Sequence, residues 1–309
     1  MPDAVIPTPT PTPTRRPKVW LLADRPGWAY DRMCHGIQAA VRDAFECRIA
    51  YVAAEPDLAA WDYDLVLVCF WGETWHQQFT SDPRRVLKLV SSHRWQEQSY
   101  GNLTTTEFAQ RHLSDAGTLG ATSQRLLQLL SNVRDIQHTP QGVETEHFTP
   151  ALEAAAADRP LAFTDRPLTF GWAGNAADPC KGLNDILRPA AHGFVLRTAT
   201  GDLNNDEMAE FYRDIDVLLV ASTLEGEPRT ALEAMSAGCF VIATDVGIAS
   251  ELIDNGDNGL IINRTPTAFR AAMHWCNQNR IQVLQAGAAN RARMQTSRTW
   301  RSVAPNWLQ

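Results

Sequence analysis

Two glutamates separated by seven residues lie where a predicted strand gives way to a predicted helix. Glu225 follows the apolar run at 217–221, and Glu233 falls within the helix predicted over 230–237. Residues that follow a parallel strand collect at the carboxyl end of the sheet, so we expect Glu225 to face a ligand there. Glu233 could accept hydrogen bonds from both hydroxyls of a ribose. Alternatively, Glu225 is only a helix-start carboxylate and Glu233 a surface residue.

The start of that helix offers a place for an anion. Gly226 permits a backbone turn, and Pro228 suits the beginning of a helix. The backbone N–H groups of Arg229, Thr230 and Ala231 would then have no partner within the helix. We therefore expect an anion-binding site at this helix end.

A second loop supplies a cation. It follows the predicted strand 168–172, and Gly174 and Gly182 let it bend close to a ligand. Lys181, one of only three lysines in the chain, is a compact, flexible cation suited to a diphosphate. The loop has neither the Gly-Lys-Ser/Thr ending of a P-loop nor the GxGxxG pattern of a dinucleotide-binding loop. A lysine in a surface loop is the alternative, but the anion site on the next-but-one strand favours a diphosphate.

The elements that must position these residues alternate between strands and helices from residue 18 onward. We predict strands at 18–23, 48–53, 65–70, 86–90, 118–121, 136–138, 168–172, 194–199, 217–221, 240–244 and 260–263. We predict helices at 28–45, 124–130, 206–215, 230–237 and 267–276. Apolar strands that alternate with helices predict an α/β protein with parallel sheets covered on both faces.

The chain of 309 residues is long enough for about two domains. We predict a disordered Pro/Thr tail (1–16), an N-terminal domain (17–150), a linker (151–167), a C-terminal domain (168–295) and a C-terminal tail (296–309). Trp300 and Trp307 would anchor the last segment, which could pack back on the N-terminal domain. Paired domains of this kind bind ligands in the cleft between them.

Composition excludes several classes of protein. The net charge is −7 and neither half has a basic excess, so we expect no nucleic-acid partner. No apolar run approaches the length of a membrane span, and the N-terminal residues lack the apolar core of a signal peptide. The six cysteines are scattered without a CxxC pair, so no zinc site is recognisable. We expect a cytoplasmic protein that could contact the inner face of the membrane peripherally.

These motifs together resemble the nucleotide-binding domain of family 4 glycosyltransferases, the group 1 type with GT-B architecture. Glu225 and Glu233 match the family's signature pair of glutamates. Residues 238–244 match its small-Gly-x-x-Val-Ile-Ala-Thr strand, Asn258-Gly259 its Asn-Gly turn, and residues 139–150 its interdomain segment. The resemblance covers residues 118–265 well and the N-terminal domain, which is short for the family, only in outline.

The resemblance implies a GT-B fold, with two Rossmann-like parallel-sheet domains facing a central cleft, and the retaining transfer of a sugar from a nucleotide-diphosphate donor. Glu225 would contact the donor sugar near the reacting carbon, and Glu233 would hold the ribose. Lys181, Gly174, Gly226 and the helix start at Arg229 and Thr230 would surround the leaving diphosphate, whose charge Lys181 and the helix start would neutralise.

No metal or other cofactor is implied, because the lysine and the helix end supply the positive charge. The Asp-x-Asp pairs, Asp62/Asp64 and Asp214/Asp216, precede strands and indicate strand-entry residues rather than metal ligands. Asn175 stands where family members often carry an arginine that acts on the diphosphate. One cation is therefore missing, unless Arg197 or Arg229 substitutes for it.

Residues of the N-terminal domain complete the expected site. Gly27 matches a glycine-containing family loop that faces the donor phosphates. Trp28 and Tyr30 have flat faces that suit stacking on an acceptor sugar, or they simply pack at a helix start. His93 follows the strand 86–90, where related enzymes place a cleft histidine. It could donate a hydrogen bond to the transferred sugar, or be an idle surface residue.

Three functions remain open at this stage. The first is an active retaining glycosyltransferase with a nucleotide-sugar donor and a glycan, lipid-linked or protein acceptor, as in polysaccharide biosynthesis. The second is a catalytically silent protein that binds a nucleotide sugar or acts as a scaffold. The third is a GT-B relative of another class, such as an epimerase or a phosphorylase. The residues fix neither the sugar, the nucleotide nor the acceptor.

Overall fold

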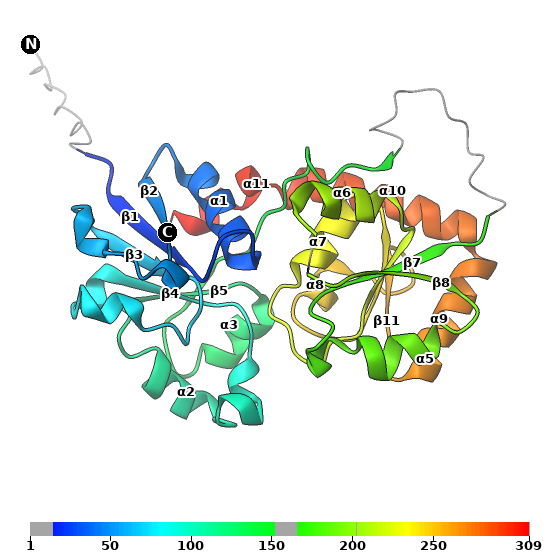
Figure 1. The fold of residues 1–309 in the computed structure, drawn as a ribbon, viewed down its shortest axis with the longest axis horizontal. Helices are drawn as coiled ribbons and strands as arrows, with labels where there is room; N and C mark the ends of the chain where they lie inside the picture. Colours follow the sequence, from blue (N-terminus) through cyan, green and yellow to red (C-terminus); the bar gives the residue numbers. More distant parts are fainter. Residues whose placement is uncertain (1–14, 152–165, 202, 309) are drawn as a thin grey trace, which may run out of the picture.

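The computed structural model describes residues 15–151, 166–201 and 203–308. Two parallel α/β domains lie side by side, one from each half of the chain (Figure 1). The predicted Pro/Thr tail up to residue 14 and nearly all of the predicted linker lie outside the described residues. Arg15, which we assigned to that tail, instead donates a hydrogen bond to Asp64 Oδ1 at 2.7 Å, in a salt bridge beside the first strand.

The N-terminal domain is built on a 6-stranded sheet in the order β2-β1-β3-β4-β5-β6. The strands are β1 Lys18–Ala23, β2 Glu46–Tyr51, β3 Leu65–Val68, β4 Val86–Val90, β5 Thr118–Ala121 and β6 Gln137–His138. The helices are α1 Ala29–Val41, α2 Thr105–His112 and α3 Gln124–Leu130. Neighbouring strands are parallel throughout. The strand order reverses at β1, so a ligand crevice is expected at the carboxyl ends of β1 and β3.

The C-terminal domain has a 5-stranded parallel sheet in the order β11-β10-β9-β7-β8. The strands are β7 Thr169–Ala173, β8 Val195–Ala199, β9 Val217–Val220, β10 Phe240–Ala243 and β11 Gly259–Ile261. The helices are α5 Arg188–Ala190, α6 Asn205–Arg213, α7 Arg229–Ser236, α8 Ala249–Leu252, α9 Pro266–Gln278 and α10 Arg280–Ser297. Here the order reverses at β7, which places the crevice at the carboxyl ends of β7 and β9.

The prediction of an α/β protein with two parallel sheets is confirmed. Every residue of β9 and β10 is buried, as in sheets that helices cover on both faces. Helix α2 was not predicted, because its apolar residues are few. Its start carries a reciprocal capping box, in which Thr104 and Glu107 each bond the other's backbone N–H.

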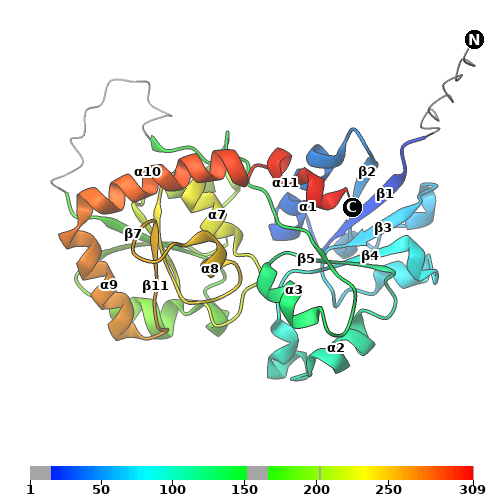
Figure 2. The same cartoon turned by 180° about the vertical axis from the view of Figure 1, so that it is seen from behind.

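The C-terminal tail, for which we predicted no helix, is helical. After α10, helix α11 (Trp300–Trp307) begins at Thr299, whose hydroxyl accepts a hydrogen bond from a backbone N–H. Helix α11 leaves the C-terminal domain and lies against α1, as both views show (Figures 1 and 2). Trp307 Nε1 donates to the carbonyl of Pro140 at 2.9 Å. The last helix thus completes the core of the N-terminal domain.

Gly36 in α1 makes room for the Trp300 ring. A Cβ atom at position 36 would lie 1.9 Å from a ring carbon of Trp300. We expect Gly36→Ala to cost about 1–3 kcal/mol of unfolding free energy, because the ring must shift. In a Trp300→Ala background the same change should be neutral or stabilising, because alanine is better than glycine in a helix by about 1 kcal/mol.

The measurement is urea unfolding of the four proteins of this double-mutant cycle. Trp300→Ala alone should cost about 3–5 kcal/mol, as expected for a large aromatic side chain in a core. An equal cost of Gly36→Ala in both backgrounds would show that Trp300 does not limit the space at position 36.

Candidate functional site

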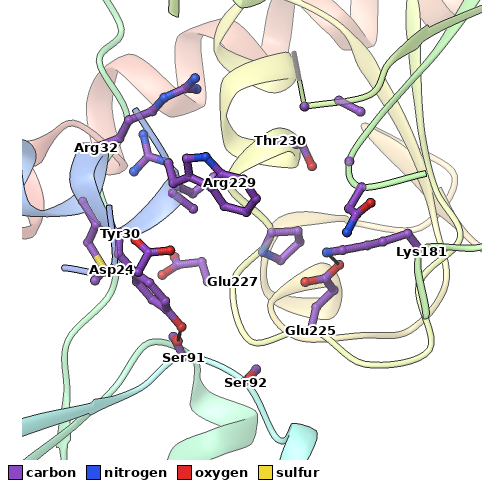
Figure 3. A pocket seen from close by; sticks show the side chains of 18 of the residues that line it. Asp24, Tyr30, Arg32, Ser91, Ser92, Lys181, Glu225, Glu227, Arg229 and Thr230 are labelled. Carbon is purple, nitrogen blue, oxygen red and sulfur yellow. Dashed lines mark hydrogen bonds and ion pairs between the residues drawn. The ribbon is translucent and has the colours of Figure 1, made fainter. Parts of the chain in front are cut away.

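A cleft of about 740 Å³ lies between the two domains, at the carboxyl ends of strands from both sheets (Figure 3). The loops after β1, β3, β4, β7 and β9 contribute its walls. The predicted site residues that line it are Gly27, Trp28, Tyr30, Gly174, Asn175, Lys181, Glu225, Arg229, Thr230 and Glu233. His93 and Gly226 are not among the residues that line it.

Lys181 and Glu225 are in direct contact. The Lys181 ammonium donates a hydrogen bond to Glu225 Oε1 at 2.5 Å, and the Ser222 hydroxyl donates to the same oxygen at 2.7 Å. Burial alone would lower the pKa of Lys181, but the Glu225 carboxylate offsets it, and the pKa is raised. The loop can reach this position because Gly182 has φ +70 and lies against the carbonyl of Ala221. The site therefore holds a charged lysine beside a carboxylate.

Glu233 is buried inside α7, so the alternative of a surface residue is wrong. The Tyr212 hydroxyl donates a hydrogen bond to Glu233 Oε2 at 2.9 Å. Oε1 has no hydrogen-bond partner among the described residues and lies 3.4 Å from Arg229 Nη2 and 3.7 Å from Arg32 Nη1. Burial raises the pKa of Glu233, although both arginines act in the opposite direction. One carboxylate oxygen is thus oriented by a tyrosine, while the other is buried beside two arginines and accepts no hydrogen bond within the described residues.

Helix α7 begins at Arg229, with Pro228 in the capping position and no side chain bonded to its first turn. The backbone N–H groups of Arg229 and Thr230 have no backbone partner within the described part of the chain. The third expected donor is not free, because the N–H of Ala231 donates to the carbonyl of Pro228 at 3.0 Å. Two N–H groups, rather than three, are available to an anion.

The two domains touch at Gly226. A Cβ atom there would lie 1.8 Å from the carbonyl oxygen of Ser91, at the end of β4. Gly226 does not have a positive φ, so our expectation that a turn requires this glycine is wrong. Close approach of two backbones requires it instead.

His93 lies beside this contact and is not among the residues that line the cleft. Ser91 and Ser92 form the wall there, and the chain turns His93 inward, so that it is buried. Its Nδ1 has no hydrogen-bond partner among the described residues. Burial, with the nearby Arg125 charge, lowers the pKa of His93 and favours a neutral ring. The hydrogen bond from His93 to the transferred sugar stays a prediction.

Trp28 and Tyr30, on the wall that the N-terminal domain contributes, both line the cleft and contact different neighbours. Trp28 is exposed, with the guanidinium carbon of Arg25 3.3 Å from the centre of its ring. Tyr30 is hydrogen-bonded through its hydroxyl to the Ser91 hydroxyl at 2.9 Å. Trp28 therefore keeps only one face for a sugar, and Tyr30 is held at the interdomain contact.

Asn175 supports its own turn. Its Oδ1 accepts a hydrogen bond from the N–H of Ala177 at 3.0 Å. Arg197, a candidate substitute for the missing cation, pairs with Asp214 at 2.8 Å and does not line the cleft. Arg229 does line the cleft, but its guanidinium is 3.2 Å from Glu144, which lies in the interdomain segment 139–150. Arg197 is therefore excluded as the substitute.

Glu227 is a cleft residue that sequence reasoning missed. The N–H of Gln141 donates to its Oε2 at 2.7 Å, and Arg298 donates to its Oε1 at 3.0 Å. Burial raises the pKa of Glu227 to about 8, even though Arg298 opposes the shift. Only the fold could reveal this, because Gln141 and Arg298 are far from Glu227 in sequence.

Asp64 and Asp216 have the predicted strand-entry role. Asp64 Oδ2 accepts from the N–H of Lys18 at 2.8 Å, and Asp216 Oδ2 accepts from the N–H of Thr169 at 2.7 Å. A search of the described residues finds no group of three or more His, Cys, Asp or Glu side chains placed to hold a metal ion. Within the same residues, no helix combines the length and apolar character needed to cross a membrane.

Part of the chain matches a known family. Residues 164–279 match the family described as "Glycosyl transferases group 1". A 95-residue segment is 46% identical to the lipopolysaccharide core biosynthesis mannosyltransferase LpsB of Rhizobium meliloti, covering 29% of this chain and 26% of LpsB. A 162-residue segment is 30% identical to the D-inositol 3-phosphate glycosyltransferase of Stackebrandtia nassauensis, covering 40% and 36%. The matches thus span about a quarter and a third of these relatives.

Solved structures match over nearly the whole chain. Sucrose-phosphate synthase of Thermosynechococcus elongatus superimposes with a TM-score of 0.73 at 17% identity, covering 95% of this chain and 98% of that one. HepE of Anabaena, in complex with UDP and glucose, gives 0.65 at 13% identity over 95% and 98%. The predicted GT-B fold is confirmed, and the resemblance to group 1 glycosyltransferases is confirmed over residues 164–279.

The raised pKa of Glu227 predicts how stability depends on pH. A carboxyl group whose pKa rises on folding binds more protons when folded, so the free energy of unfolding falls as pH rises between its unfolded and folded pKa values. We expect this fall from about pH 5 to about pH 8. Glu227→Gln should remove this fall. The unfolding free energy of the variant relative to that of the wild type should therefore rise by at least about 1 kcal/mol between pH 5 and pH 8.

Urea unfolding at pH 5, 6.5 and 8 measures this difference. Only the slope is diagnostic, because the glutamine also changes the hydrogen bonds that position 227 makes with Gln141 and Arg298 at every pH. Parallel curves for the two proteins would show that Glu227 does not titrate in this range.

Proposed function

We propose that this protein is a retaining glycosyltransferase that moves a sugar from a nucleotide-diphosphate donor to a carbohydrate, lipid-linked or other acceptor. The proposal is carried by one observation. The Lys181–Glu225 pair, the open start of α7 and the unbonded Oε1 of Glu233 face a single cleft between two Rossmann-like domains. The match of residues 164–279 to group 1 glycosyltransferases supports it.

The parts of the site suit the parts of a nucleotide sugar. The ribose hydroxyls would donate to Glu233, and the diphosphate would lie between Lys181 and the N–H groups of Arg229 and Thr230. In the reaction the bond from the sugar C1 to the phosphate oxygen breaks, a bond from C1 to the acceptor oxygen forms, and the proton of the acceptor hydroxyl passes to the departing diphosphate. Positive groups held ready for the leaving diphosphate stabilise the charge that develops on it. Glu225, beside Lys181, would face the sugar at C1.

The same groups lead us to propose metal-independent transfer, because a lysine and a helix end supply the charge that a metal would. On the N-terminal wall, the free face of Trp28 offers a stacking surface for an acceptor sugar, and Tyr30 lies next to it. The name of the LpsB relative supports a setting in polysaccharide assembly. We place the protein in the cytoplasm, with peripheral contact to the inner face of the membrane and without a nucleic-acid partner.

A catalytically silent nucleotide-sugar-binding protein is the second candidate. The observation that favours it is Asn175, which lines the cleft with an uncharged side chain engaged in its own turn. Such a protein would bind the nucleotide as proposed and would not turn the donor over.

Calorimetric titration with UDP, GDP and ADP, without metal, tests the donor site. We expect one nucleotide to bind, and Lys181→Ala to weaken it at least tenfold, about 1.4 kcal/mol, through loss of the phosphate contact. Lys18→Ala is the matched control, since Lys18 lies over the Trp61 ring and outside the cleft. An equal loss in both variants, or no binding by the wild type, would refute the site.

Donor hydrolysis in the same samples separates the two candidates. Slow release of sugar from the nucleotide sugar by the wild type, lost in Lys181→Ala, is expected of a transferase that lacks its acceptor. Tight nucleotide binding without hydrolysis would instead favour the silent binder. With an acceptor in hand, a product that keeps the anomeric configuration of the donor would identify the retaining reaction, and an inverted product would exclude it.

A further inference from the structure

One cation of the cleft differs from the others in its partners. Among the described residues, the lysine and arginines that line the cleft are Arg32, Arg94, Lys181 and Arg229. The last three each donate a hydrogen bond to a carboxylate. The Arg32 side chain makes none within the described part of the chain, and its ion pair with Glu233 spans 3.7 Å. Arg32 therefore has hydrogen-bond donors to spare.

Arg32 comes from the opposite domain to the rest of the predicted donor site. It lies in the first turn of α1, after the Gly27 loop, whereas Glu233 and Lys181 belong to the C-terminal domain. Figure 3 shows Arg32 on the wall that carries Tyr30 and faces the one that carries Lys181. Its side chain is 20% exposed, so it meets the cleft with part of its surface and is not free in solvent.

We propose that Arg32 binds the donor phosphate that is attached to the ribose, and so completes the donor site across the cleft. This inference rests on the function proposed above, because it takes Glu233 as the ribose ligand. A group 3.7 Å from that carboxylate can reach the phosphate on the ribose 5′ oxygen by a rotation of its side chain. The planar guanidinium fork matches two phosphate oxygens.

The charge balance of the cleft supports the same assignment. Asn175 is uncharged, so Lys181 is the cation that the loop after β7 brings to the cleft. Lys181 is already hydrogen-bonded to Glu225. Arg229 is committed to Glu144. Glu233 stays charged when it binds the ribose, and Arg32, which makes no side-chain hydrogen bond among the described residues, keeps its donors for a phosphate. A donor bound in this way is held from both domains.

The test compares Arg32→Ala with wild type for the diphosphate, the monophosphate and the nucleoside of whichever base binds best. The last two are measured by competition against the diphosphate. We expect the diphosphate and the monophosphate to weaken by the same factor, about tenfold, and the nucleoside to weaken much less, because it lacks the phosphate. Lys181→Ala should instead weaken the diphosphate more than the monophosphate, since it serves the outer phosphate.

Two controls exclude a merely structural effect. Arg42→Ala removes an exposed arginine at the end of the same helix and should change neither binding nor melting temperature. Arg32→Lys keeps the charge and should recover part of the affinity. The melting temperature of Arg32→Ala should stay well above the temperature of the titration, so that a loss of affinity is not caused by unfolding.

Several results would overturn the inference. Unchanged nucleotide binding by Arg32→Ala would remove Arg32 from the site. Equal losses for the nucleoside and both nucleotides would move Arg32 to the ribose, and a loss confined to the diphosphate would move it to the outer phosphate. A wild type that binds none of UDP, GDP and ADP would refute the proposed function itself, which distinguishes that failure from a failure of Arg32 alone.

Discussion

A buried carboxylate holds the donor loop to both connections between the domains. Glu227 accepts hydrogen bonds from the backbone of Gln141, in the interdomain segment 139–150, and from Arg298, where the chain returns from α10 to α11. Two residues before it, Glu225 meets Lys181, and two residues after it, α7 begins at Arg229. A buried polar group is costly to leave without a hydrogen-bond partner, so Glu227 holds these two segments together.

The pattern of apolar strands was sufficient to predict the fold. Parallel strands buried on both faces, such as β9 and β10, leave an unambiguous trace in the sequence, and predicted strand positions agree with the observed ones to within two residues. Helix α2 left no such trace, because its stability rests on a capping box more than on an apolar stripe. The C-terminal helix was hidden for another reason: Trp300 packs on a helix far away in sequence.

The site was predictable where it depends on local geometry. A residue that follows a parallel strand lies at the carboxyl end of the sheet. For this reason Lys181, Glu225 and Asn175 line the cleft. Contacts between the domains were not predictable, because no local signal encodes them. Gly226 was assigned to a turn although a backbone from the other domain requires it, and His93 lies behind that same contact. The same holds for Arg32 and Glu227, because their partners come from distant parts of the sequence.

The position of α11 bears on the order in which the chain can fold during synthesis. Domains made first commonly fold first, yet the core around α1 lacks the Trp300 ring until residues 300–307 have been made. Until then Gly36 lies in an uncovered groove of α1. We therefore expect the C-terminal domain to mature before the N-terminal one, with the cleft assembled only after residues 300–307 have been made.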